Sequence, residues 1–158
     1  MKTSHSKTDH CQAINPANVA AERCVLGAVI EDESLWRKLT DSGLRSQHFY
    51  LSDHRRVFGA IDRLKGRSMP VDYISVAEEL GNLGGDYVLI ASLVHGVVVQ
   101  ENHVLHHAAI IRKKSRLRSL LKIGEWIQKA VTEIAEPDSL TAQIRNMLDG
   151  CSEDQISA

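Results

Sequence analysis

Residues 101–134 read ENHVLHHAAIIRKKSRLRSLLKIGEWIQKAVTEI, and this stretch decides the fold. It contains no proline, and its only glycine is Gly124. Six residues recur along it at spacings of 3, 4, 3, 4 and 3: Leu117, Leu120, Gly124, Ile127, Val131 and Ile134. This heptad spacing is typical of a helix that packs lengthwise against another helix. We therefore predict one long helix from Asn102 to about Ile134, roughly 50 Å long at 1.5 Å per residue.

A second, shorter helix is predicted to fold back on the first. Glu136-Pro137-Asp138 interrupts the long helix, because proline cannot continue a helix interior. Apolar residues then share one side of a helix predicted from Ser139 to Leu148: Leu140, Ile144, Met147 and Leu148. The shorter arm of such a hairpin cannot cover the longer one, and contiguous exposed apolar surface usually marks an interface. We therefore predict self-association through the six heptad residues and Ile144.

The preceding residues, 18–100, are predicted to form a globular head of about five short helices. The expected helix starts are Asn18, Glu33, Ser52 or Asp53, the capping-box sequence Ser75–Glu78, and Asp86. The expected stops include Gly43, Gly66 and Gly81. Val97–Val99 is interpreted as a buried loop, since no second strand is predicted to pair with it. The predicted fold class is all-α, a compact orthogonal bundle of short helices followed by a long helical hairpin.

Individual side chains of the head receive packing roles. Glu22 is placed in the first turn of the first helix, near the positive end of the helix dipole. Cys24 is expected to pack in the core. The aromatic side chains Phe49, Tyr50 and Phe58, with His54, are expected to form a core cluster.

The composition favours a soluble, cytoplasmic protein. The 158 residues carry a formal net charge of −1 and three cysteines, which form no CxxC pair and fit a reducing compartment. The most apolar stretch, Val88–Val99, is shorter than the roughly 20 residues that cross a membrane. The predicted organisation is a disordered tail (1–17), the head (18–100), the hairpin (101–150) and a second tail (151–158).

Five groups of residues, in this order, resemble the motifs of one family. They are Ala21-Glu22 with Val25-Leu26-Gly27; Phe49-Tyr50 with His54, Val57-Phe58 and Ala60-Ile61; Pro70-Val71-Asp72 with Val76–Leu80; Gly84-Gly85 with Tyr87-Val88; and Asn102 with Ala108, Ile110–Arg112 and Leu117-Arg118. This order resembles the N-terminal domain of DnaB-type replicative DNA helicases. His107, where the family usually has tyrosine, and Ala20, where an acidic residue is common, depart from the pattern.

The resemblance implies a domain of six or seven helices that dimerises through its hairpin. In the family such domains form a collar that docks the helicase-binding domain of primase and, in some systems, a helicase loader. The sequence contains no G-x-x-x-x-G-K-[ST] motif, the loop that cradles nucleotide phosphates in helicase motors. We therefore predict a non-catalytic protein-interaction module of the replication machinery, without cofactor or metal. Its predicted partners are a second copy, primase, a loader or a full-length helicase.

Alternative functions stay open at this stage. A basic run includes Arg112, Lys113, Arg116 and Arg118, with Lys114 and Lys122 beside them. It is a candidate contact for a partner or for nucleic-acid phosphates. His103, His106 and His107 have a spacing that could place zinc ligands on one helix face, although the glutamate of H-E-x-x-H is absent. A modulator of a host helicase is a further interpretation.

Overall fold

A computed structural model describes residues 15–81, 85–133 and 136–153. Within these ranges the chain forms seven α-helices and one short 3₁₀ helix, η1, and no strand. The elements are α1 (Val19–Glu31), α2 (Leu35–Asp41), η1 (Ser46–His48), α3 (Ser52–Gly66), α4 (Tyr73–Leu80), α5 (Gly85–Val94), α6 (Glu101–Glu133) and α7 (Pro137–Glu153). The prediction of an all-α fold is confirmed.

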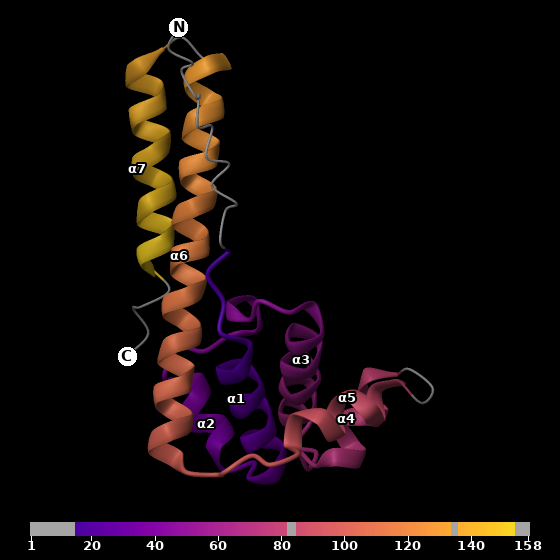
Figure 1. Cartoon of the computed structure of the whole chain (residues 1–158). Helices are drawn as coiled ribbons and strands as arrows, with labels where there is room; N and C mark the ends of the chain where they lie inside the picture. Colours follow the sequence, from indigo (N-terminus) through magenta and orange to yellow (C-terminus); the bar gives the residue numbers. More distant parts are fainter. Residues whose placement is uncertain (1–14, 82–84, 134–135, 154–158) are drawn as a thin grey trace, which may run out of the picture.

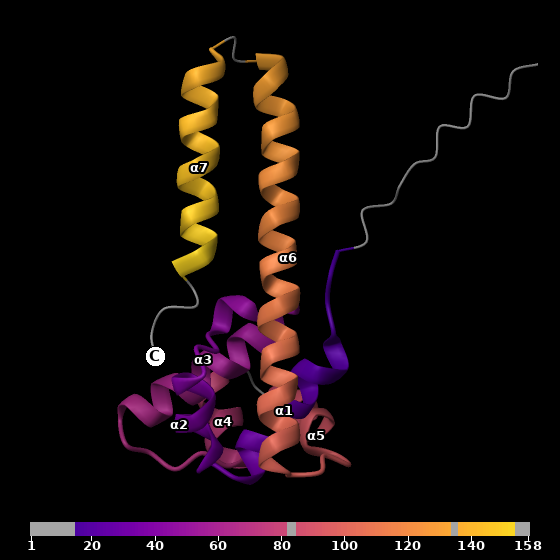
Figure 2. The same cartoon turned by 90° about the vertical axis from the view of Figure 1, so that its left-hand side faces the viewer.

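Helix α1 lies at the centre of the head, where it packs against α3, α5 and α6 (Figures 1 and 2). Most of its residues from Ala21 to Ile30 are buried, because apolar side chains occupy almost every side of the helix. The first half of α6 runs along the head. Its second half extends beyond the head beside α7, so the long axis of the molecule is the axis of α6 (Figure 1).

Several helix boundaries differ from the sequence prediction. Asn18 caps α1 as predicted, and its side-chain oxygen accepts a hydrogen bond from the Ala21 amide at 3.0 Å. The predicted capping box at Ser75 is wrong, because Asp72 accepts the Ser75 amide at 2.8 Å and α4 already begins at Tyr73. Helix α7 begins at Pro137, whose missing N–H costs nothing in the first turn of a helix.

The start of α3 also differs, and the difference involves Glu22. Neither Ser52 nor Asp53 caps this helix, because the cap position is Leu51, which makes no side-chain cap bond. The carboxylate of Glu22, a residue that is only 1% exposed, lies at this helix start instead. It accepts hydrogen bonds from the amides of Tyr50 at 2.6 Å and Leu51 at 3.4 Å. One carboxylate oxygen lies 2.7 Å from Nδ1 of His54, in the first turn of α3.

Glu22 lies in the first turn of α1, as predicted, and its carboxylate also acts on the start of α3. A buried carboxylate is stable only when hydrogen bonds replace the water it has lost. The loop amides and the His54 ring supply those bonds, and the negative charge lies next to the positive end of the α3 dipole. Two segments that are 28 residues apart in the sequence are thereby held together.

A close backbone approach at Gly27 sets the distance between α1 and α5. A Cβ atom built on Gly27 would lie 2.3 Å from the Leu93 carbonyl oxygen and 2.8 Å from Cγ2 of Val97. Only glycine permits this approach. The prediction of a loop at Val97–Val99 is confirmed, but the prediction that it is buried is wrong, because Val98 is 77% exposed and Val99 40% exposed. Val97 packs against Gly27 of α1. The next side chain, Val98, points in a different direction, as successive side chains of an extended segment do.

The predicted aromatic core is confirmed and has one further member. Phe49, His54 and Phe58 are buried, while Tyr50 is half-buried. Trp36 of α2, which the sequence analysis did not include, packs on Phe58 with ring centroids 4.7 Å apart. Cys24, expected in the core, is only half-buried.

Replacing Glu22 with glutamine tests the buried carboxylate. In the native protein the amides of Tyr50 and Leu51 and the His54 ring face carboxylate oxygens. The NH₂ group of glutamine would place a donor against one of these donors. We expect the free energy of unfolding to fall by about 2–4 kcal/mol, because buried donors lose a charged acceptor. Urea unfolding followed by circular dichroism measures the change. Glu125→Gln, on an exposed part of α6, is the matched control, and equal stabilities of the two variants would contradict this role of Glu22.

Replacing Gly27 with alanine tests the close approach. The new methyl group must displace backbone of α5, so we expect a loss of about 2 kcal/mol or more. Gly59→Ala is the matched control inside α3, where a Cβ atom would meet only the flexible end of Arg63 at 3.6 Å. That control should gain about 0.5–1 kcal/mol from the better helix propensity of alanine. A thermal melt in which both variants change in the same direction would exclude our account of Gly27.

Candidate self-association surface on the helical hairpin

The two halves of α6 have different neighbours. In the first half, Val104, Ala108 and Ile111 are buried against the head. In the second half, Ile123 and Ala130 are buried, where α7 runs alongside (Figure 2). These two residues are seven apart, so α7 covers one narrow face of α6.

The predicted heptad residues lie mainly outside this covered face. Leu117 is 39% exposed, Leu120 41% and Val131 61%, whereas Gly124 and Ile127 are half-buried. Ile134 lies outside the described residues. Leu121, which the sequence analysis did not include, is 43% exposed and lies one turn beyond Leu117 on the helix surface. We call Leu117, Leu120, Leu121, Gly124 and Val131 the α6 stripe.

Helix α7 is too short, and has too few apolar side chains, to bury the rest of the apolar surface of α6. It has 17 residues against the 33 of α6. Leu140 and Ile144, the residue predicted to join the interface, are half-buried, while Met147 and Leu148 remain exposed. The hairpin therefore presents large apolar side chains from both of its arms to solvent.

The four basic candidates have different environments. Lys113 and Arg116 are exposed, and Arg112 is half-buried. Arg118 is engaged within the chain, because its guanidinium donates to the Pro16 carbonyl at 2.8 Å and to the His48 carbonyl at 2.6 Å. It also lies over the Tyr50 ring, 5.6 Å from the ring centroid. Burial lowers the pKa of Arg118, and the negative charge of Glu22 acts in the opposite direction.

Arg118 therefore connects the hairpin to the head. Pro16 precedes α1, and His48 and Tyr50 belong to the segment that Glu22 holds against α3. Arg118 and Glu22 thus bind neighbouring parts of the same segment, His48–Leu51, and together they connect α6 and α1 to the start of α3. A signal for this connection was present in the sequence, because Glu22 shares a helix face with Val25, Leu26 and Val29, and Arg118 follows Val104 and Ile111 at intervals of seven.

The three histidines of α6 do not converge as metal ligands would. The rings of His106 and His107 have centroids 6.2 Å apart. Among the residues placed by the structure, no three His, Cys, Asp or Glu side chains are grouped closely enough to hold a metal ion. Burial, and then the charges of His106 and His103, lowers the pKa of His107. This favours a neutral, packed imidazole at that position.

None of the described helices combines the length and apolar character that crossing a membrane requires.

Comparison with known proteins identifies relatives that match most of the chain. The chain is 32% identical over 155 residues to the replicative DNA helicase DnaB of Rhodothermus marinus, covering 92% of this chain and 16% of that protein. It is 32% identical over 136 residues to DnaB of Geobacillus stearothermophilus, covering 82% of this chain and 29% of that protein. The chain thus spans less than a third of the length of these relatives.

The fold agrees with a solved domain. The crystal structure of the N-terminal domain of DnaB helicase from Mycobacterium tuberculosis superposes with a TM-score of 0.74 at 27% identity, covering 85% of this chain and 98% of that one. The family model described as the DnaB-like helicase N terminal domain matches residues 14–113. The chain therefore belongs to the family of DnaB-like helicase N-terminal domains.

Proposed function

We propose that this chain is a non-catalytic module of the DNA replication machinery that associates with a second copy of itself through the α6 stripe. The observation that carries this proposal is the stripe itself, where Leu117, Leu120, Leu121 and Val131 are each at least 39% exposed on a helix already packed on another face. Burying apolar side chains from water stabilises an association by roughly 25 cal/mol per Å² before the costs of binding. Gly124, half-buried within the stripe, has space around it that a partner helix can approach.

The head provides the second part of the proposed function. We assign it the docking of a replication partner, either the helicase-binding domain of primase, a helicase loader or a full-length helicase. Membership of the family supports this role. The matched region is the N-terminal domain of proteins named replicative DNA helicases, and we assign the chain no ATP hydrolysis of its own.

A nucleic-acid contact through the basic residues of α6 receives less support. Arg118 donates to two backbone carbonyls, so its guanidinium is not presented to phosphates. Lys113 and Arg116 are exposed and could orient an acidic partner surface. Such charges speed encounter more than they add affinity.

The double variant Leu120→Asp/Val131→Asp tests self-association. Both side chains are exposed in the single chain, so folding should be retained, whereas burial of two unpaired charges in an interface costs several kcal/mol, roughly 3–5. Light scattering should show the wild type as a dimer or larger and the variant as a monomer. Lys122→Asp is the matched control, because it lies about 200° around the helix from Leu120. A wild type that is monomeric at high micromolar concentration rejects the proposal.

Calorimetry tests the docking role of the head. The full chain is titrated with the primase C-terminal domain, and separately with the full-length helicase, from the same source. We expect moderate affinity with weak salt dependence, because grooves between short helices are filled mainly by apolar anchors. If neither partner binds at tens of micromolar while a DNA duplex binds with a steep salt dependence, the nucleic-acid function replaces the docking function.

A further inference from the structure

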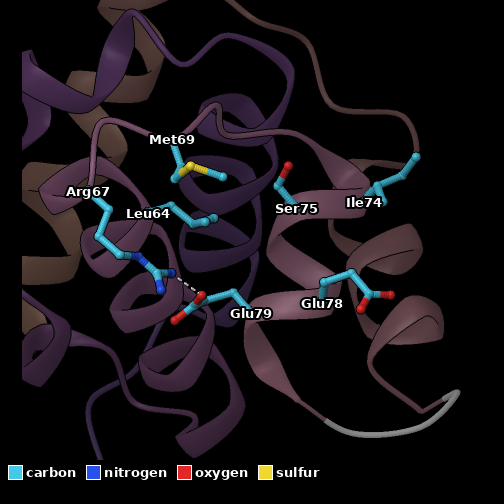
Figure 3. Close-up of a pocket in the computed structure, with 7 residues that line it drawn as sticks. All are labelled: Leu64, Arg67, Met69, Ile74, Ser75, Glu78 and Glu79. Carbon is cyan, nitrogen blue, oxygen red and sulfur yellow. Dashed lines mark hydrogen bonds and ion pairs between the residues drawn. The ribbon is translucent and has the colours of Figure 1, made fainter.

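The head has a hollow of about 480 Å³ on the side away from α6, between the end of α3, the connection to α4, and α4 itself (Figure 3). It is lined by Leu64, Arg67, Met69, Ile74, Ser75, Glu78 and Glu79. Its volume falls within the range of sites that hold small ligands or the side chains of a bound peptide. It lies apart from the hairpin, and of its lining residues only Glu78 and Glu79 belong to the family motifs named above.

The upper wall of the hollow is held in place by the end of α3. Amide hydrogen bonds from Met69 to Leu64, at 2.9 Å, and from Ser68 to Lys65, at 3.0 Å, form the two-bond helix end known as the Schellman motif. Ser68 has a φ of 55°, the left-handed conformation that this motif requires. Just beyond, the Val71 amide donates to a Glu33 carboxylate oxygen at 3.0 Å. The connection is therefore a formed wall before anything binds.

Two apolar side chains of the lining, Met69 and Ile74, are exposed to solvent. Leu64 forms the floor and is 4% exposed, and Met69 lies over it, as the hydrophobic contact of a Schellman motif does (Figure 3). Half of the Met69 side chain nevertheless remains in water, and Ile74 on α4 is 64% exposed. Helix α4 buries Val76 and Ala77 on its inner side, so Ile74 contributes little to the core.

The charges around the hollow are unequally paired. Arg63 and Arg67 both bind Glu79, and these two hydrogen bonds lower the pKa of the Glu79 carboxyl. Glu78, one turn beyond Ile74, is exposed and points away from that ion pair (Figure 3). Glu78 accepts a hydrogen bond from the neutral phenol of Tyr87, and this bond raises the pKa of that tyrosine. Glu78 is thus a carboxylate with a neutral neighbour beside two exposed apolar side chains.

We propose that this hollow binds a peptide segment of a partner protein in which an apolar side chain, such as Leu or Met, lies one helical turn from a Lys or Arg. The apolar side chain enters between Met69, Leu64 and Ile74, and the cation meets Glu78. A cation is specified because the cationic groups of the rim are already bound to Glu79. The inference rests on the head being a docking module, and it adds where and by what chemistry one partner segment is recognised.

Methionine methyl resonances provide the test. The chain has only three methionines, Met1, Met69 and Met147, so methyl-¹³C-methionine labelling gives one signal in the hollow and one on α7, assigned with Met69→Leu. The probe is a short Ala-rich helical peptide with one Leu and, four positions later, one Lys. It should shift the Met69 signal and not that of Met147. The same peptide with Ser for Leu should leave Met69 unchanged, and the peptide with Glu for Lys should bind about tenfold more weakly.

A charge variant separates the two parts of the recognition. Glu78→Gln keeps an acceptor for Tyr87 but removes the charge. It should therefore weaken binding of the Lys peptide several-fold and leave binding of the Glu peptide unchanged. Glu125→Gln on α6 is the matched control. The proposal is overturned if millimolar Lys peptide leaves Met69 unshifted, if the Lys and Glu peptides bind equally, or if Met147 shifts at the same concentrations. Binding of the primase or helicase without a Met69 shift rejects the hollow alone, whereas a peptide response without binding of those proteins rejects only the proposed partners.

Discussion

The carboxylate of Glu22 is the group on which the rest of the structure depends. It is almost fully buried on the central helix, and its position requires that donors be brought to it. The amides of Tyr50 and Leu51 and the His54 ring meet this requirement. The loop between η1 and α3 therefore has one allowed position, and α3, which has no side-chain cap of its own, begins where this carboxylate lies.

The hairpin is placed by the continuation of the same group of interactions. Arg118 binds the carbonyl of His48 in the segment that Glu22 holds, and it binds the carbonyl of Pro16, three residues before the start of α1. Together with the buried apolar residues of the first half of α6, these bonds set the direction in which the second half leaves the head. The α6 stripe is consequently presented at a fixed position relative to the head, which is what a symmetric association through the hairpin needs.

Each residue of the opening motif Ala21-Glu22 and Val25-Leu26-Gly27 now has a physical reason. Ala21 is a small side chain buried in the core, Glu22 orders the start of α3, Val25 and Leu26 fill the core, and Gly27 permits the backbone of α5 to approach. The sequence resemblance identified these residues without identifying their roles. Glu22 was interpreted from its neighbours in the chain, whereas its partners come from α3.

Local patterns were sufficient to predict where most of the helices lie, although not every boundary. The uninterrupted run from Asn102 predicted α6 within one residue of its start, and Asn18, Gly66 and Gly81 marked boundaries that the structure has. The heptad spacing also predicted an uncovered apolar seam, because periodicity shows which side chains share a face. It did not show which face α7 would cover, so Leu121 was not included and Ile127 was not recognised as half-buried.

The sequence by itself therefore determined the helical class, most of the element order and the residues available for an interface, since these follow from spacing and propensity along the chain. The tertiary structure decided how α3 begins, the role of Arg118 and the hollow beside Met69. Each of these depends on atoms brought together from distant segments, such as Glu22 with His54 or Leu64 with Glu79. Distances between such atoms are set by packing, which no local pattern encodes.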